Sequence, residues 1–306
     1  AFAHEIDERG RAALREMRWM ARLSPLVGWW AQADPSFRDT FNGFVWEVPD
    51  PAGKGKQIVG NVSLNRAPGS RQRWIICNVV VQAKYRGQGI GRRLTEAAVA
   101  EAQTLGAQGV ILQVYQDNPP AWVLYTDLGF REAAGETELR LEAAKEVPLL
   151  DVPGYRFHAW RPGDGQATYE LARLAIPAVQ HWIRPVRADR YQPSWSTRLG
   201  ERFTALMGRR RVYRLTVHKE SRLVAVLTVT AALLRGEHRI ELLVHPDHTG
   251  QVDAALISRA LHMLAALPSK PVRVTVDKDH TEALEVLRSY GFQEQRTLLT
   301  MRKDFG

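Results

Sequence analysis

The sequence predicts an α/β protein built from two similar domains in tandem, and three observations lead to this prediction. Its 306 residues suggest two domains of the usual size of about 150 residues each. Apolar segments with the two-residue period of strands alternate with amphipathic helical segments. The order of these segments in the first half of the chain returns in the second half at a constant spacing.

Corresponding residues of the two halves lie 162 positions apart, as Val110 and Val272 do. Gly129 and Gly291 share this offset, whereas Gly87 and Gly250 are 163 apart, so the second copy is one residue shorter in between. An internal duplication explains the pattern. We therefore expect a first domain over residues 1–145, a proline-containing linker over 146–154 and a second domain over 155–306.

The first half begins with helical spacing from His4 to about Trp30 and in a short piece over Phe37–Phe41. The expected strands are Phe44–Val48, Ile58–Leu64, Arg73–Val81 and Val110–Val114. One helix is expected up to Gly106 and another from Pro119 to about Leu128, followed by a polar hairpin that turns at Gly135. The second half opens with a strand, Tyr155–Trp160, so either the first copy lacks this strand or it precedes Ala1.

Composition narrows the class of protein. Apolar residues make up 45% of the chain, no apolar run reaches the ~18 residues of a membrane helix, and Cys77 has no partner cysteine. We therefore expect a cytoplasmic protein with no membrane partner. Most of the net charge of +9 comes from residues 151–306. That excess could attract nucleic acid, acidic substrates or phosphates, or could simply keep the surface soluble.

The most informative stretch runs from Val79 to Leu94. The β-branched run Val79–Val81 ends there, three glycines follow at alternating positions between arginines, and an amphipathic helix begins at once. Glycines let backbone N–H groups face a ligand, and the first turn of a helix offers unpaired donors and a positive dipole end. The stretch predicts an anion-binding site, and a glycine-rich turn without a ligand is the alternative.

Two common phosphate loops do not fit this spacing. The dinucleotide fingerprint needs glycine where Arg92 stands, and the P-loop needs Gly-Lys before Ser or Thr, which is absent from the chain. The run Arg86-Gly87-Gln88-Gly89-Ile90-Gly91 instead resembles the pyrophosphate loop of the GCN5-related N-acetyltransferases, the GNAT family.

This resemblance implies two GNAT-like domains, each a mixed, mostly antiparallel sheet flanked by helices. It implies acetyl-CoA as cosubstrate and a small-molecule or peptide amine as acceptor. The thioester would lie along Val79–Val81, and Arg86 and Arg92 would assist the pyrophosphate unless they are simply solvated. The residues implied in cofactor binding are Val79, Val80, Val81, Arg86, Gly87, Gln88, Gly89, Ile90, Gly91, Arg92 and Asn118.

A second stretch similar to the family begins at Asn118 and includes Tyr125, Gly129 and Phe130. In the family, the asparagine contacts the cofactor and the tyrosine often donates a proton to the departing CoA thiolate. Tyr125 is therefore the candidate catalytic acid, a role typically worth about 10²–10⁴ in rate. The alternatives are a tyrosine that only packs on its helix and an asparagine that only caps it.

A general base is not evident. Many relatives carry a glutamate on the strand before the loop, but this strand reads Trp74-Ile75-Ile76-Cys77-Asn78 and contains no acid. Glu47 is the nearest candidate, with an exposed strand position as its alternative, and a water chain or a partly neutral amine would serve equally well. Cys77 has no adjacent histidine and is expected to be a structural thiol.

The second copy departs from the pattern in its loop, His245–Ala254, where one glycine survives and two aspartates appear. Carboxylates would repel a pyrophosphate, so we expect no acetyl transfer there. His280 and Leu287 replace Asn118 and Tyr125. The spacing of His245 and His248 loosely resembles that of metal ligands, but no further Cys/His cluster supports a metal site.

Two other stretches of the second half are rich in aromatic and basic residues. His181–Pro185 with Tyr191 and Trp195 corresponds to the helical region that walls the acceptor site in the family, as Trp29-Trp30 does in the first copy; packing between domains is the alternative. Arg209–Arg211 is expected to be a solvated turn before a strand, with a phosphate or nucleic-acid contact as the alternative.

Taken together, these patterns predict an acetyl-CoA-dependent N-acetyltransferase in which the acceptor amine attacks the thioester directly. The rival hypothesis is a non-catalytic acyl-CoA-sensing or basic interaction module. Nucleic acid is not the expected partner. The acceptor and the oligomeric state are not determined by the sequence.

Overall fold

A computed structural model describes residues 42–306 except for 51–52, 54, 193–199 and 201–209. The helices expected over 4–30 and 37–41 lie outside these residues, as do Trp29, Trp30, Trp195 and Arg209. No helix of the described part is long and apolar enough to cross a membrane.

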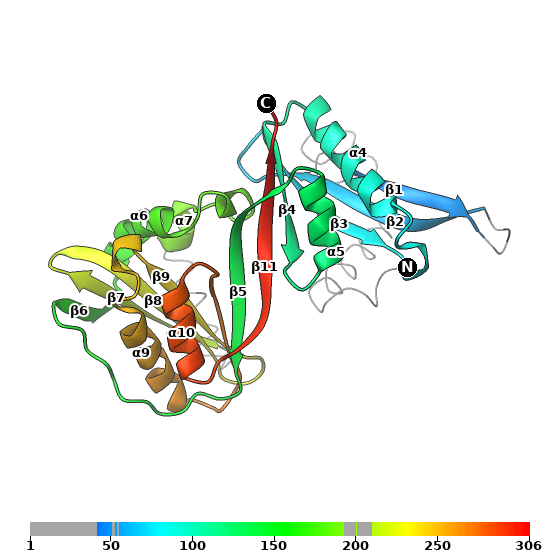
Figure 1. Cartoon of the computed structure of the whole chain (residues 1–306). Coiled ribbons are helices and arrows are strands. Elements are labelled where there is room, and N and C mark those ends of the chain that lie inside the picture. The colour runs from blue at the N-terminus through cyan, green and yellow to red at the C-terminus, as the bar shows by residue number, and fades with distance from the viewer. Residues whose placement is uncertain (1–41, 51–52, 54, 193–199, 201–209) are drawn as a thin grey trace. The chain divides into compact units, whose positions relative to one another are not determined.

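The chain forms two compact units whose segments interleave along the sequence (Figure 1). The first unit contains the described residues up to Gln113, Pro120–Arg131 and Met301–Gly306. The second contains Val114–Pro119 and Glu132–Thr300. The sequence predicted two consecutive domains, whereas here the last six residues of the chain belong to the first unit, because the final strand continues into it.

Strands and helices follow each other along the chain as expected for an α/β protein. The strands are β1 (Asn42–Pro49), β2 (Lys56–Arg66), β3 (Arg73–Val81), β4 (Gly109–Tyr115), β5 (Arg131–Leu141), β6 (Tyr155–Ala159), β7 (Arg210–Lys219), β8 (Arg222–Ala232), β9 (His238–Val244), β10 (Val272–Asp277) and β11 (Gln293–Asp304). The helices are α4 (Ile90–Thr104), α5 (Pro119–Asp127), α6 (Gly165–Ala175), α7 (Ala188–Tyr191), α9 (Asp253–Ala265) and α10 (Thr281–Ser289).

In the first unit the strand order is β1-β2-β3-β4, followed by the end of β11. The pairs β1–β2 and β2–β3 are antiparallel, and β3–β4 is parallel. Helix α4 covers one face of β1, β2 and β3 (Figure 1). A Cβ at Gly60 of β2 would lie 2.9 Å from Leu94 and 3.0 Å from Ile90, so this glycine allows the helix its close approach.

In the second unit the strand order is β11-β5-β10-β9-β8-β7-β6. The pair β9–β10 is parallel, and the pairs from β6 to β9 and β5–β10 are antiparallel. Helices α9 and α10 pack on one face through a core that includes Leu256, Ile257 and Leu287. Leu171 of α6 packs with a separate cluster formed by Leu223 and Val226 of β8. The expected mixed, mostly antiparallel sheets flanked by helices are confirmed.

The predicted hairpin through Gly135 is wrong, because Arg131–Leu141 is one continuous strand. Gly135 does not have a positive φ. A Cβ there would lie 2.5 Å from the side chain of Lys278 and 3.1 Å from Leu299. The glycine therefore permits close approach of neighbouring chain segments and does not form a turn.

The start of β7 also differs from the expectation. Arg210 and Arg211 belong to the strand and lie opposite Ala232 and Ala231 of β8, so they do not form a turn before it. Both side chains are exposed.

Candidate functional site

The first feature of the candidate site is a separation of two parallel strands in the first unit. Strands β3 and β4 pair only over Arg73–Ile75 and Gly109–Ile111. Beyond these residues no pairing between the two strands is recorded, although β3 continues to Val81 and keeps its pairing with β2. The Val79–Val81 backbone therefore presents groups on its β4 side that are not used in the sheet.

The glycine loop follows directly on β3 and leads into α4. Gly87 and Gly89 have φ values of 77° and 76°, which L-residues with a side chain rarely adopt. A Cβ built at either position would meet nothing within 4 Å. Gly91 has no positive φ, and its Cβ would make ordinary contacts with Leu124 and Val81 at 3.7 and 3.8 Å.

The N-terminus of α4 has the properties of an anion site. Gly89 is its N-cap in the left-handed conformation, and the first turn contains no acidic residue and no side-chain cap. In the described part of the chain, no hydrogen bond outside the helix is recorded from the N–H groups of Gly87–Gly91. These donors and the helix dipole together can hold a phosphate group.

The two arginines predicted to assist the pyrophosphate have protein partners. The Nε of Arg86 donates to the carbonyl of Val81 at 3.1 Å. The Nη2 of Arg92 lies 2.7 Å from Oδ2 of Asp127 in α5. This ion pair joins α4 to α5, and the sequence analysis missed it because the two residues are far apart in the chain.

Tyr125 lies on α5 and is only 6% exposed. Its ring packs edge-on against Phe130, with 6.0 Å between ring centroids. Burial raises the pKa of Tyr125 to about 12, so the hydroxyl stays protonated at neutral pH and has a proton to donate. Asn118 lies directly before α5, where its backbone N–H donates to the Tyr115 carbonyl at 3.0 Å.

The two residues considered for base and nucleophile roles are engaged elsewhere. Glu47 forms an exposed ion pair with Lys56 at 3.3 Å on the β1–β2 hairpin. Cys77 accepts a hydrogen bond from Nδ2 of Asn65 at 3.3 Å. Burial raises the pKa of the Cys77 thiol to about 11, which disfavours the reactive thiolate.

The second unit repeats the strand separation. Strands β9 and β10 pair in parallel only over His238–Ile240 and Val272–Val274. This is the same three-residue contact as between β3 and β4. Both units therefore contain a pair of parallel strands that separate after three residue pairs.

The helix N-terminus of the second unit is occupied by the protein itself. Asp253, the first residue of α9, is 1% exposed, and its Oδ2 accepts the N–H of Gly250 at 2.6 Å. Its Oδ1 lies 2.9 Å from Nε2 of His280. The repeat offset places Asp253 at the position of Gly91 and His280 at that of Asn118, so the sequence contained the signal for this pair.

The histidines of the second loop form local contacts. The rings of His245 and His248 are 5.7 Å apart, Arg222 lies 2.8 Å from Nε2 of His245, and the Tyr155 hydroxyl lies 2.9 Å from Nδ1 of His248. The described residues contain no group of three or more His, Cys, Asp or Glu that could hold a metal ion.

The aromatic and basic stretch of the second unit is partly buried. Trp182 is 5% exposed, and Nε2 of His181 lies 3.1 Å from the Ile176 carbonyl. Arg184 reaches Glu136 of β5 at 3.9 Å. Tyr191 ends α7, and its pKa is raised mainly by burial.

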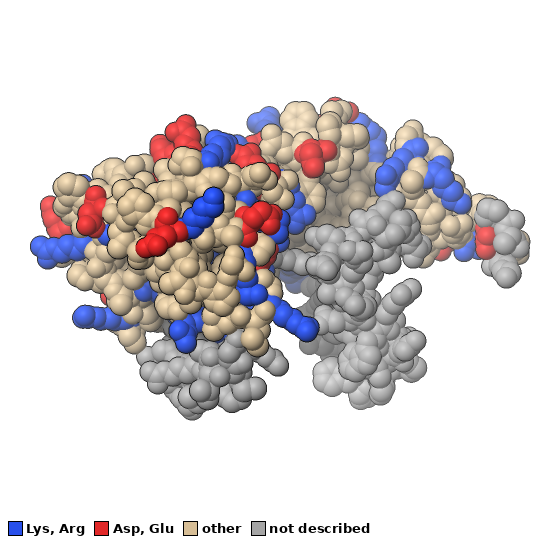
Figure 2. Space-filling model, turned by 90° about the horizontal axis from the view of Figure 1, so that it is seen from below, with Lys and Arg blue, Asp and Glu red and all other residues tan. Residues whose placement is uncertain are grey.

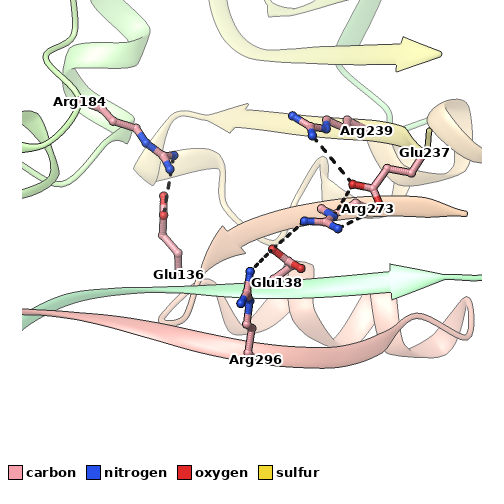
Figure 3. Close-up of polar contacts among 7 residues, drawn as sticks. All are labelled: Glu136, Glu138, Arg184, Glu237, Arg239, Arg273 and Arg296. Carbon is pink, nitrogen blue, oxygen red and sulfur yellow. Dashed lines mark hydrogen bonds and ion pairs between the residues drawn. The ribbon is translucent and has the colours of Figure 1, made fainter. Parts of the chain in front are cut away.

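Ion pairs cover part of the β5–β10–β9 region of the second unit (Figure 3). Arg273 lies between two carboxylates, 2.6 Å from Glu237 and 3.2 Å from Glu138. Arg239 and Arg296 reach the same carboxylates at 3.9 Å. Charged groups that already have partners therefore occupy this surface.

Basic residues on the described surface are mixed with acidic ones. Figure 2 shows Lys and Arg interspersed with Asp and Glu over the described part of one face, without a single basic patch. This face does not show the clustered positive charge that nucleic-acid binding usually uses.

Comparison with known proteins gives a consistent picture. The profile of the acetyltransferase (GNAT) family matches residues 11–130. A mycothiol acetyltransferase from Jonesia denitrificans is 38% identical over 91 residues, which are 28% of this chain and 29% of the relative. One from Frankia alni is 30% identical over 158 residues, 44% of this chain and 45% of the relative. The matches thus span less than half the length of these relatives.

Two solved structures share the fold over most of the chain. A GCN5-related N-acetyltransferase from Sphaerobacter thermophilus has a TM-score of 0.56 at 17% identity and covers 82% of this chain and 78% of its own. A tandem GNAT protein from the clavulanic acid biosynthesis pathway has a TM-score of 0.50 at 19% identity and covers 82% and 80%. At these identities the similarity shows the fold alone.

Proposed function

Residues 11–130 match the acetyltransferase (GNAT) family, and on this premise we propose that the first unit transfers the acetyl group of acetyl-CoA to a primary amine. The single observation that carries the proposal is the open N-terminus of α4 beside the separated strands β3 and β4. Together they offer backbone donors for a pyrophosphate and for a thioester.

In the proposed complex the Gly87–Gly91 backbone holds the pyrophosphate and Val79–Val81 holds the thioester. Hydrogen bonds from such donors to a charged group are worth about 1.5–3 kcal/mol each. Arg86 and Arg92 stay close to this loop through Val81 and Asp127. The cofactor contact implied for Asn118 stays a prediction.

The proposed reaction is direct transfer. The amine nitrogen attacks the thioester carbon, backbone N–H groups on Val79–Val81 stabilise the oxyanion, and the C–S bond breaks. Tyr125 donates its proton to the leaving sulfur, and the proton lost by the amine passes to solvent. The high pKa of Tyr125 ensures that the hydroxyl carries the proton it must give.

We propose that the second unit does not bind acetyl-CoA. The carboxylate of Asp253 already occupies the anion position of the loop and uses the Gly250 donor. A phosphate would meet a like charge there, which disfavours binding.

The decisive experiment combines calorimetry with acetyl-CoA and an assay of CoA thiol release over a panel of amines. Tight binding without thiol release for any amine would favour an acyl-CoA sensor instead of an enzyme. Gly89→Ala should weaken acetyl-CoA binding at least about tenfold, because the left-handed conformation costs an L-residue roughly 1–2 kcal/mol and distorts the donors.

Gly106→Ala is the matched control for that variant. Gly106 follows the other end of α4 with a φ of 73°, and a Cβ there also meets nothing within 4 Å. Both variants should lose similar stability, but Gly106→Ala should keep its affinity. Equal affinity for acetyl-CoA in the two variants would refute the assignment of the loop. A third variant, Gly89→Glu, should abolish binding, because its carboxylate would repel the pyrophosphate.

A further inference from the structure

We propose that Asn61, Ser63, Asn65 and Asn78 form an acceptor-contacting wall that selects amines flanked by uncharged hydroxyl or amide groups over polycationic amines. We call these four residues the amide wall. The inference rests on the proposed acetyl transfer in the first unit and specifies its substrate class.

The alternation of β2 places the amide wall on the sheet face opposite α4. Val62 and Leu64 are buried and share the side of Gly60, which faces the helix. The residues between and beside them, Asn61, Ser63 and Asn65, point to the other face and are half-buried.

A β-bulge in β3 brings Asn78 into this group. Asn61 lies opposite Val80 and Ser63 opposite Cys77, so β3 has one extra residue at this point. Asn78 has a φ of 54°, a conformation that asparagine tolerates better than most residues. Its Nδ2 donates to the Ser63 hydroxyl at 3.2 Å, and its backbone carbonyl accepts from Nδ2 of Asn61 at 3.1 Å.

The position of the bulge relates the amide wall to the reaction. Asn78 immediately precedes Val79–Val81, the segment proposed to hold the thioester. An amine that attacks the thioester from the side opposite α4 would approach these residues, because the amide wall and Val80 share that face of the sheet.

The side chains of the amide wall are uncharged hydrogen-bonding groups. In the recorded contacts Asn61, Asn65 and Asn78 donate through their amide nitrogens. For the described part of the chain, no hydrogen bond to their side-chain oxygens is recorded. These oxygens can accept from hydroxyl or N–H groups of a ligand.

Uncharged hydrogen-bond acceptors on the protein distinguish between classes of amine substrate. None of the four side chains ionises, and the adjacent Cys77 thiol stays neutral because burial raises its pKa to about 11. A second ammonium group would find no carboxylate among them, whereas each hydroxyl or amide of a ligand could pair with an amide. A site built for such pairs rejects ligands that lack them.

The test measures kcat/KM for CoA release with glucosamine, glycinamide, butylamine and spermidine, each normalised to the neutral amine concentration. Glucosamine and glycinamide represent hydroxyl and amide flanks. For at least one of them, kcat/KM should exceed the values for both butylamine and spermidine by about 2- to 10-fold for each hydrogen bond formed. A preference for spermidine over both would overturn the inference and leave the acetyl transfer intact.

Asn78→Asp provides the discriminating variant, because aspartate keeps the shape and tolerates the positive φ while adding a carboxylate. It should lower the ratio of kcat/KM for the preferred amine, the one with hydroxyl or amide flanks, to kcat/KM for spermidine at least about tenfold. Asn61→Asp should change this ratio in the same direction. Asn42→Asp is the control: Asn42 lies opposite Leu64 on the α4 side of the sheet and should leave the ratio unchanged.

Calorimetric titration with acetyl-CoA checks that each variant is folded and binds the cosubstrate. An unchanged ratio in both wall variants would overturn the inference. Absence of CoA release with every amine in the native protein would overturn the proposed acetyl transfer and the inference with it.

Discussion

Removal of the carboxylate of Asp253 tests the view that the second unit fills its own anion site. Asp253→Asn keeps an oxygen that can accept the Gly250 N–H, so the variant isolates the ion pair with His280. Loss of one partner of a buried ion pair typically costs about 3–5 kcal/mol. Because the His280 side chain is 15% exposed, we expect the lower end, about 3 kcal/mol.

The loss of stability caused by Asp253→Asn should depend on pH in a defined direction. Burial opposes the charge of His280, but the adjacent carboxylate of Asp253, with Glu282 and Asp277, raises the pKa of His280 above its ordinary value of 6.5. A raised pKa stabilises the fold fully below the unfolded value, and this stabilisation is lost as the pH rises through the folded value. The difference between wild type and Asp253→Asn should therefore shrink as the pH rises above 6.5.

The measurement is urea unfolding between pH 5 and about pH 9, with hydrogen exchange over residues 250–265 as the local readout. Asp279→Asn is the matched control, since its carboxylate is 73% exposed in an ion pair with Lys278 and such pairs contribute about 0–1 kcal/mol. A destabilisation that does not change with pH, or one no larger than that of Asp279→Asn, would refute the reasoning.

Two further predictions concern Tyr125 and Arg273. Tyr125→Phe should keep the packing on Phe130 and lower kcat by about 10² or more, and an unchanged kcat would remove the residue from the mechanism. The Tyr125 pKa of about 12 predicts no loss of wild-type kcat by its ionisation up to about pH 10. In the second unit, Arg273→Ala leaves Glu138 and Glu237, each 20% exposed, without their nearest partner, which should cost about 1–3 kcal/mol in urea unfolding. Arg239→Ala removes only a contact at 3.9 Å and serves as its control; equal losses would contradict this account.

The elements that the sequence predicted well are those with a local signal. Strands β1, β2 and β3 show alternation, and α4 lies between two glycines with positive φ, Gly89 at its N-cap and Gly106 just beyond its C-cap. The same locality explains the error at Gly135. A glycine in a polar stretch is compatible with a turn, and only the side chains of Lys278 and Leu299 show that it serves a close approach. Those residues are more than a hundred positions away in the chain.

Prediction of the candidate site had the same limits. The loop Gly87–Gly91 was identifiable because its spacing lies within one segment of sequence. The pairing of Arg92 with Asp127 depends on how α4 and α5 pack, which sequence periodicity does not specify. The bulge at Asn78 depends on the register of β2 against β3, so the sequence could show that no acid precedes the loop but not what replaces it.

The repeat explains why one unit is the candidate for catalysis and the other is not. Both units keep three pairs of parallel strand residues followed by a separation, so the separation alone cannot decide cofactor binding. The difference lies at the first turn of the following helix, where one copy has Gly91 and no acidic residue within the turn and the other has the buried carboxylate of Asp253. A negative charge at this helix N-terminus is favourable in both units. In the second unit the protein supplies that charge itself, and in the first we propose that a ligand supplies it.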